Sequence, residues 1–217
     1  MSEKKFKNWE EERKEPILSS TIEKLHKAPP LKDRLSNAIY RLKTLSNKLD
    51  EQASKLEQRE KEFFNKCIDA QMGRDSSRAD VYANECAQLR KMIKILINAQ
   101  MAIEQVVVRL ETLKDFGDIT TQLAPLVPLV HSIKTHLMGI MPEVSSELET
   151  IGQTLDNLVI EAGEADGINR YNASISEEES DNILRDARAI AEQKLKEKFP
   201  DLPSTPQTEQ KGASLRS

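Results

Sequence analysis

The sequence predicts an all-α protein: a long antiparallel helical hairpin with additional shorter helices and a disordered C-terminal tail. The 217 residues are 31% charged and only 4% aromatic, with 7 glycines, which is typical of long helices rather than of a thick globular core. Leucines recur every seven residues from Leu31 onward. A short polar break, "MGRDSS", then precedes a second long stretch of helical character. Two long helices joined by a short turn fold into a hairpin.

The first long helix is expected from about Leu31 to Met72, a length of roughly 60 Å at 1.5 Å per residue. Pro30 suits its opening, because proline lacks the N–H that a first turn leaves unused. One seam of the heptad pattern is Leu35, Leu42, Leu49, Leu56 and Phe63, and the other is Leu31, Ala38 and Leu45. Residues 1–30 form a leader in which Phe6 and Trp9 are apolar anchors among lysines.

The break after Met72 carries signals for a helix end and a new start. Gly73 is expected in the left-handed position that terminates helices, and Ser77 with Asp80 matches a capping box. The second helix is expected from about Arg78 to Phe116, which completes a basic hairpin over residues 31–116. Its middle is apolar on nearly every face, so it needs more than one neighbour, either later helices or another subunit. We expect this packing or polymer interface to include Met92, Ile95, Met101, Val106 and Val108.

The remaining chain divides at prolines and polar runs. Pro125 and Pro128 predict a kink or restart, and Pro142 suits the first position of a helix. The expected units are helices three and four over 117–163, an acidic linker over 164–176, a short helix over 177–198, a proline-rich motif over 199–206 and a disordered tail over 207–217.

Charge is unevenly distributed along the chain. Residues 1–120 carry 23 Lys and Arg against 20 Asp and Glu, a net of +3, whereas residues 121–217 carry 9 against 16, a net of -7. Between residues 24 and 48 only Asp33 is acidic, and the basic residues are Lys24, Lys27, Lys32, Arg34, Arg41, Lys43 and Lys48. The basic and acidic parts could attract each other or serve different partners.

Two interpretations of the basic segment are open. It is either the solvated face of a coiled coil or a patch for an anionic membrane surface, where each basic residue contributes about 1 kcal/mol. In the second case Phe6 and Trp9 would insert at the lipid interface. Nucleic acid is a third option, but no aromatic interleaving or binding motif accompanies the charge, so no nucleic-acid partner is expected.

The sequence offers no catalytic constellation, so an enzyme, a cofactor and a metal site are all disfavoured. Cys67 and Cys86 form no disulfide framework and are expected to be small buried side chains in a reducing compartment. His131 and His136 are five residues apart and therefore on different helix faces. No apolar run reaches the length of a membrane span and no secretory signal opens the chain, which predicts a cytoplasmic protein.

The segment "FPDLPSTP" near the C-terminus has three prolines at regular spacing. Proline fixes φ and extends the residue before it, so the segment is stiffened in advance and loses little entropy on docking. A helix stop alone would need one proline. The spacing therefore favours a ligand in which Phe199 and Leu202 enter pockets.

In this order, these features resemble the ESCRT-III family, and within it the archaeal cell-division branch of CdvB-type proteins. The resemblance covers roughly residues 20–206 and rests on "LKDRLSNAIYRLKTLSNKLDEQASKLEQREKEFFNKC" and "YANECAQLRKMIKILINAQMAIEQVVVRLET". The segment "FPDLPSTP" resembles the second class of MIT-interacting motif. Longer CdvB proteins carry a winged-helix domain after that motif, so the chain resembles a shorter paralogue lacking it.

The resemblance implies a subunit that polymerises with itself and with paralogous ESCRT-III subunits. Monomers would be soluble and closed, and opened monomers would form filaments on the inner face of the cell membrane at the division site. An AAA+ ATPase of the Vps-four type, called CdvC in archaea, would disassemble them through its MIT domain. The implied docking residues are Phe199, Pro200, Leu202, Pro203 and Pro206. The alternative is a cytoplasmic coiled-coil adaptor or scaffold that does not polymerise.

Overall fold

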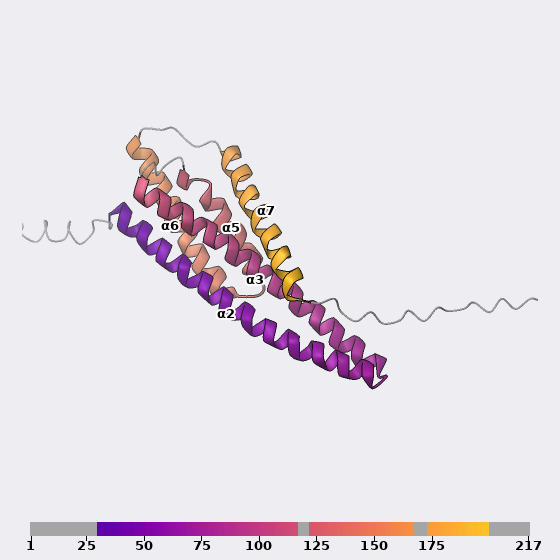
Figure 1. The fold of residues 1–217 in the computed structure, drawn as a ribbon. Helices are drawn as coiled ribbons and strands as arrows, with labels where there is room; N and C mark the ends of the chain where they lie inside the picture. The colour runs from indigo at the N-terminus through magenta and orange to yellow at the C-terminus, as the bar shows by residue number, and fades with distance from the viewer. Residues whose placement is uncertain (1–29, 117–121, 167–172, 200–217) are drawn as a thin grey trace, which may run out of the picture.

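The structure is a computed structural model that describes residues 30–116, 122–166 and 173–199. The described part is entirely helical, which confirms the all-α prediction (Figure 1). The leader, the linker between 167 and 172 and the tail from 200 onward lie outside the described residues. The helices are α2 (Leu31–Met72), α3 (Ser76–Phe116), α5 (Leu126–Leu137), α6 (Pro142–Asp166) and α7 (Ala173–Lys198).

Helices α2 and α3 form the predicted antiparallel hairpin. Its alignment is marked by hydrogen bonds from Ser46 to Glu104 at one level and from Cys67 to the carbonyl of Ala79 near the turn. Helices α5, α6 and most of α7 pack against the half of the hairpin remote from this turn, and only the end of α7 reaches beyond that half, to Glu57 and Arg90 (Figure 1). The turn end of α2 and α3 therefore extends as a two-helix tip, beyond the end of α7.

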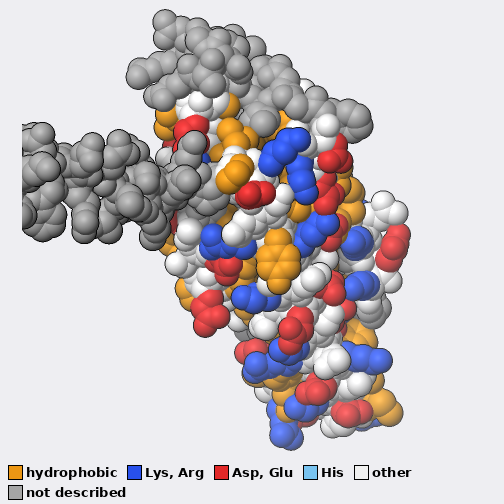
Figure 2. Space-filling view, turned by 90° about the vertical axis from the view of Figure 1, so that its left-hand side faces the viewer, with side chains coloured by type: hydrophobic (Ala, Val, Ile, Leu, Met, Phe, Trp, Pro, Cys, Tyr) orange, Lys and Arg blue, Asp and Glu red, His pale blue; other side chains and the backbone are white. Residues whose placement is uncertain are grey.

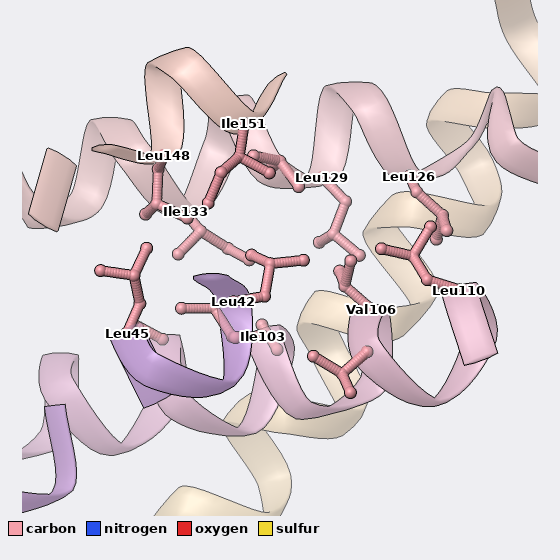
Figure 3. Close-up of a cluster of buried hydrophobic side chains, with 14 of the residues drawn as sticks. Leu42, Leu45, Ile103, Val106, Leu110, Leu126, Leu129, Ile133, Leu148 and Ile151 are labelled. Carbon is pink, nitrogen blue, oxygen red and sulfur yellow. The ribbon is translucent and has the colours of Figure 1, made fainter. Parts of the chain in front are cut away.

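The core lies where α5, α6 and α7 cover the hairpin. Leucine, isoleucine and valine side chains from α2, α3, α5 and α6 meet in one cluster, and α7 adds Ile183, Ala187 and Ala191 (Figure 3). Leu42, Ile103 and Ile133 have no exposed surface or almost none. Burial of each such side chain contributes roughly 1.5–3 kcal/mol, so this end of the hairpin is the more stable one.

The buried seam of α2 changes along the helix. Leu35, Leu42 and Leu49 are fully buried, as the heptad pattern predicts, but Leu56 and Phe63 in the same column are only half-buried. Towards the tip the buried column is instead Ala53, Glu60 and Cys67, also seven residues apart. The prediction was right where α6 also packs on α2 and wrong towards the tip, where α3 is the one described helix that packs along α2.

The turn between the long helices differs from its predicted geometry. Gly73 has φ -74°, in the right-handed region, and the left-handed residue is Arg74 with φ 57°. The cap of α3 is Asp75, whose carboxylate accepts a hydrogen bond from the backbone N–H of Arg78 at 3.1 Å. Helix α3 therefore begins at Ser76, and the predicted start at Arg78 with a cap from Ser77 was wrong.

The shorter helices follow the prolines. Helix α5 starts after Pro125, which confirms the predicted restart, and α6 starts at Pro142. Helix α7 begins at Ala173 rather than at Glu177. The run "ASIS", predicted as the end of the linker, forms the first turn of this helix.

Candidate functional site

The basic side chains of α2 contact carboxylates of other helices. Arg34 Nη1 donates to both carboxylate oxygens of Glu161 on α6, at 2.6 and 2.7 Å. Arg41 Nε donates to Glu147, also on α6, at 3.2 Å. The acidic late part of the chain is thus folded onto the basic early part, as charge attraction alone would favour.

Other members of the predicted membrane-binding set differ in their surroundings. Lys43 Nζ lies 2.6 Å from Glu111 on α3, whereas Lys32 and Lys48 are exposed. Phe6, Trp9, Lys24 and Lys27 lie outside the described residues. On the face shown in Figure 2, acidic and basic side chains are interspersed. Exposed ion pairs each contribute only about 0–1 kcal/mol, so these partners can be exchanged at small cost.

Helix α7 runs antiparallel to α3 and is held by charge as well as by its apolar face. Glu192 accepts from Lys94 on α3 at 2.7 Å, and Glu179 pairs with Arg109 on the same helix. The hydrogen bond from Lys94 holds the pKa of the Glu192 carboxyl below its usual value. The apolar part of this contact is small, since the fully buried apolar side chains of α7 are one isoleucine and two alanines.

The end of α7 contacts the base of the hairpin tip. The half-buried ring of Phe199 packs on the core cluster, and its centroid is 5.1 Å from the Arg90 guanidinium carbon. The same carbon is 5.7 Å from the Phe64 ring. Arg90 Nε donates to buried Glu60 at 2.6 Å. The other docking residues implied by the family resemblance, namely Pro200, Leu202, Pro203 and Pro206, lie outside the described residues.

Glu60 and Arg90 were not identified from the sequence. A glutamate within a heptad helix normally indicates a solvated position, and the seam chosen from the leucines placed Glu60 outside the contact. The sequence signal for a buried Glu60 is its place midway between Ala53 and Cys67, seven residues from each. These two side chains are small and leave room for a glutamate between them.

The apolar residues predicted to form an interface have different locations. Val106 is fully buried in the core, and Ile95 and Met101 are partly buried against it. Met92 is half-buried, while Val108 is 61% exposed. An open groove between α3 and α7 is lined in part by Met101, Val108 and Ile190. Of the five, Val106 is fully buried and Val108 is the most exposed.

The cysteines and histidines of the described helices make packing contacts and hydrogen bonds to backbone carbonyls. Cys67 and Cys86 are free and fully buried, and burial together with the Glu60 charge raises the pKa of Cys86 to about 11. His131 packs against Gly152, where an added Cβ would come within 3.2 Å of the ring. His136 Nδ1 contacts the carbonyl of Ser132 in its own helix. Within the described ranges, no three His, Cys, Asp or Glu side chains could together hold a metal ion.

Among the helices in the described ranges, none combines the length and the apolar character needed to cross a bilayer.

Comparison with known proteins places these features in a family. The chain is 44% identical to Cell division protein B1 of Sulfolobus acidocaldarius over 181 residues, which is 83% of this chain and 84% of that protein. The chain belongs to the Cell division protein B family. A second family member, Cell division protein B of the same organism, is 34% identical over 81% of this chain and 68% of its own length. The membership confirms the resemblance to CdvB-type proteins.

A more distant member of the Cell division protein B family is Cell division protein B3 of Sulfolobus acidocaldarius, 27% identical over 77% of this chain and 96% of that protein. No protein-family model matches the sequence. No solved structure matches it either.

Proposed function

We propose that the chain is an ESCRT-III-like, polymer-forming subunit that remodels and constricts membrane during archaeal cell division. The observation that carries this proposal is the relationship to Cell division protein B1, which extends over 84% of that protein. The subunit would act without catalytic activity of its own, assembling with copies of itself and with paralogous subunits on the inner face of the cell membrane at the division site.

The ion pairs between α2 and α6 support a closed and an open form of this subunit. In the described arrangement Glu161 and Glu147 neutralise Arg34 and Arg41, which belong to the proposed membrane-binding set. Departure of α6 would release these charges for anionic lipid headgroups, together with the exposed Lys32 and Lys48. It would also uncover core side chains for packing between subunits, including the buried Val106.

The proline-rich segment would serve for disassembly. A stiff segment with two apolar anchors suits docking into a groove of an MIT domain carried by a Vps-four-type AAA+ ATPase. Replacing both Leu202 and Pro203 with alanine is expected to abolish this binding. Wild-type affinity in that double variant would contradict the assignment of the motif.

The second candidate is a non-polymerising coiled-coil adaptor or scaffold. One observation favours it: the described helices bury most of the apolar surface of α3 within one subunit, without any partner. A chain that satisfies its own core needs no polymer to be stable.

Electron microscopy with anionic liposomes separates the two candidates. Filaments or deformed vesicles are expected for the polymer, and uncoated vesicles with single particles for the scaffold. Neutral phosphatidylcholine vesicles are the control, because the polymer depends on basic side chains. A chain truncated after Phe116 lacks the acidic helices and is expected to assemble at lower concentration. Unchanged assembly of the truncated chain would contradict closure by the acidic region.

A further inference from the structure

The open groove between α3 and α7 has the size and lining of a docking site. Its volume is about 440 Å³, within the range of roughly 300–1,000 Å³ that is typical of binding clefts. Its apolar lining includes Met101 and Val108 of α3 and Ile190 of α7. Val108 is 61% exposed and Ile190 is 41% exposed, so the described residues leave room for a further apolar group against them.

The polar lining of the groove is acidic. Glu104 of α3 and Asp186 of α7 both line it, and within the described residues neither carboxylate has a Lys or Arg partner. Glu104 accepts hydrogen bonds from uncharged side chains, one of which is Ser46 of α2. An apolar groove with unpaired carboxylates is complementary to a partner that presents apolar side chains beside positive charge.

Two basic side chains lie near the groove and do not cancel this charge. Arg109, which is part of the lining, pairs with Glu179 of α7. Lys194 Nζ lies 3.5 Å from the sulfur of Met101. Against the carboxylates of Glu104, Asp186 and Glu179, these two cations leave an excess of negative charge.

The groove lies within reach of the N-terminal leader. The hydrogen bond between Ser46 and Glu104 sets the level of the groove along α2. Ser46 is 15 residues after Leu31, so the groove is about 22 Å from the start of α2 at 1.5 Å per residue. Trp9 stands 21 residues before Pro30, and a chain of that length can span up to about 70 Å. The leader can therefore reach the groove of its own chain, and covalent attachment makes that docking intramolecular.

The leader also has the side chains that the groove would bind. Phe6 and Trp9 are large apolar side chains, and Lys4, Lys5 and Lys7 stand beside them in the sequence. Aromatic rings bring much contact area and have only two side-chain torsions to fix on docking. The rings fit the apolar lining, and the lysines fit its unpaired carboxylates.

We propose that Phe6 and Trp9 dock in the groove between α3 and α7 of their own chain when no lipid is present. The rings would lie against Val108 and Ile190, with the neighbouring lysines near the acidic side chains. Docked rings cannot insert into a membrane at the same time, so the groove would compete with lipid for the leader. Only this competition rests on the proposed membrane-binding role of the two rings; the docking does not depend on it.

Tryptophan fluorescence of the full chain tests the docking directly, because Trp9 is the one tryptophan in the sequence. Without lipid, the emission maximum of the full chain is expected at a shorter wavelength than that of a peptide of residues 1–30. Acrylamide should also quench the full chain less than the peptide, since an indole in an apolar groove is shielded from water.

Two variants change the groove at exposed positions, where the fold tolerates substitution. Val108→Lys and Ile190→Lys each replace an apolar contact with a positive charge that repels the lysines of the leader. The matched control is Ile160→Lys, at a position on α6 that is 52% exposed and does not line the groove. Both groove variants should shift the emission and the quenching to the values of the peptide, and the control should change neither. Far-UV circular dichroism checks that the helices are retained.

Three results would overturn the docking. Equal emission from the unmodified chain and the peptide would mean that the indole is in water. A shifted emission that both groove variants leave unchanged would mean that the indole is buried elsewhere. A shift that appears only as the protein concentration rises would assign the groove to the leader of a second copy.

Binding to phosphatidylserine vesicles tests the competition with lipid separately. The groove variants should bind more tightly than Ile160→Lys, which carries the same added charge, because a docked fraction no longer lowers the apparent affinity. If the fluorescence results are as expected but the groove variants bind vesicles no better than this control, the docking stands and the membrane-binding role of Phe6 and Trp9 is wrong.

Discussion

Arg34 on α2 and Glu161 on α6 are 127 residues apart in the chain, yet one guanidinium nitrogen of Arg34 binds both carboxylate oxygens of Glu161. The pair joins the basic and acidic parts of the chain at the open end of the hairpin. Arg34 is the more buried partner, with 16% of its side chain exposed against 49% for Glu161. Removal of the glutamate charge should therefore leave a basic side chain that needs a new anionic partner.

Replacing Glu161 and Glu147 with glutamine should strengthen binding to anionic vesicles. Both changes release an arginine of α2, and each released charge is expected to contribute up to about 1 kcal/mol, or roughly fivefold in affinity. Co-sedimentation with phosphatidylserine vesicles at low and high salt measures the effect, which should decline with salt. The control Asp156→Asn removes an exposed carboxylate from the same helix. Equal gains in the control would show that net charge alone, and not these pairs, governs binding.

Replacing Leu42 with alanine should cost about 2–5 kcal/mol of unfolding free energy. Its side chain is fully buried where α2, α3, α5 and α6 meet (Figure 3), so a cavity would remain. Urea denaturation followed by circular dichroism measures the loss. Val108→Ala, at a position 61% exposed, should change stability by less than about 0.5 kcal/mol. A small effect at Leu42 would mean that the four-helix core does not stabilise the fold as described.

Replacing Arg74 with glycine should stabilise the hairpin by about 0.5–1 kcal/mol. Arg74 has φ 57°, a left-handed conformation that is costly for any residue with a Cβ atom, and glycine relieves this cost at the expense of some entropy in the unfolded chain. Thermal denaturation would show a higher midpoint.

Gly73→Ala tests the same turn from the neighbouring residue. Gly73 is right-handed and an added Cβ would lie 3.4 Å from the nearest atom, the carbonyl oxygen of Asp69, which is an ordinary contact. Alanine should therefore be tolerated or mildly stabilising. A clear loss of stability would place the left-handed residue at Gly73, as the sequence alone suggested.

The thiol of Cys86 should react slowly with alkylating reagents at pH 8. Burial raises its pKa to about 11 from an ordinary value of 9.0, so the reactive thiolate is about 100-fold scarcer than in an exposed cysteine. The rate should rise as the pH approaches 11 and should rise at any pH on unfolding in urea. Mass spectrometry of iodoacetamide adducts measures it, and rapid labelling of the folded chain at pH 8 would contradict the burial of this residue.

Much of the fold could be predicted because apolar residues recur with the helical period along the long helices. The leucine column through Leu35, Leu42 and Leu49 identified the contact surface where several helices meet, and Pro142 marked the start of α6. The resemblance to CdvB-type proteins rested on the order of the helices and on "FPDLPSTP", and the relationship to Cell division protein B1 confirms it. What failed was local: Gly73 is the better left-handed residue by intrinsic preference, but the hydrogen bond from the Asp75 N–H to the carbonyl of Ala70 places the turn one residue later.

The candidate site was only partly predictable, because it depends on which helices meet. Charge asymmetry left two possibilities open, attraction between the two parts of the chain or different partners for each. Nothing in the sequence pairs Arg41 with Glu147, since their contact depends on the packing angle of α6. Likewise, Phe199 was identified as a ligand for another protein, whereas its contact with Arg90 exists only because α7 ends beside the hairpin tip.

Two helices of 42 and 41 residues that meet along a seven-residue repeat can in principle slide past each other by one repeat and bury nearly the same apolar area. The ion pair between Glu60 and Arg90 makes these alignments differ in free energy. A shift of one repeat would move the carboxylate about 10 Å along the helix axis and leave two largely buried charges apart, which typically costs about 3–5 kcal/mol. Together with the Ser46–Glu104 hydrogen bond and the short turn, this buried pair favours one alignment of the hairpin over others that apolar burial distinguishes poorly.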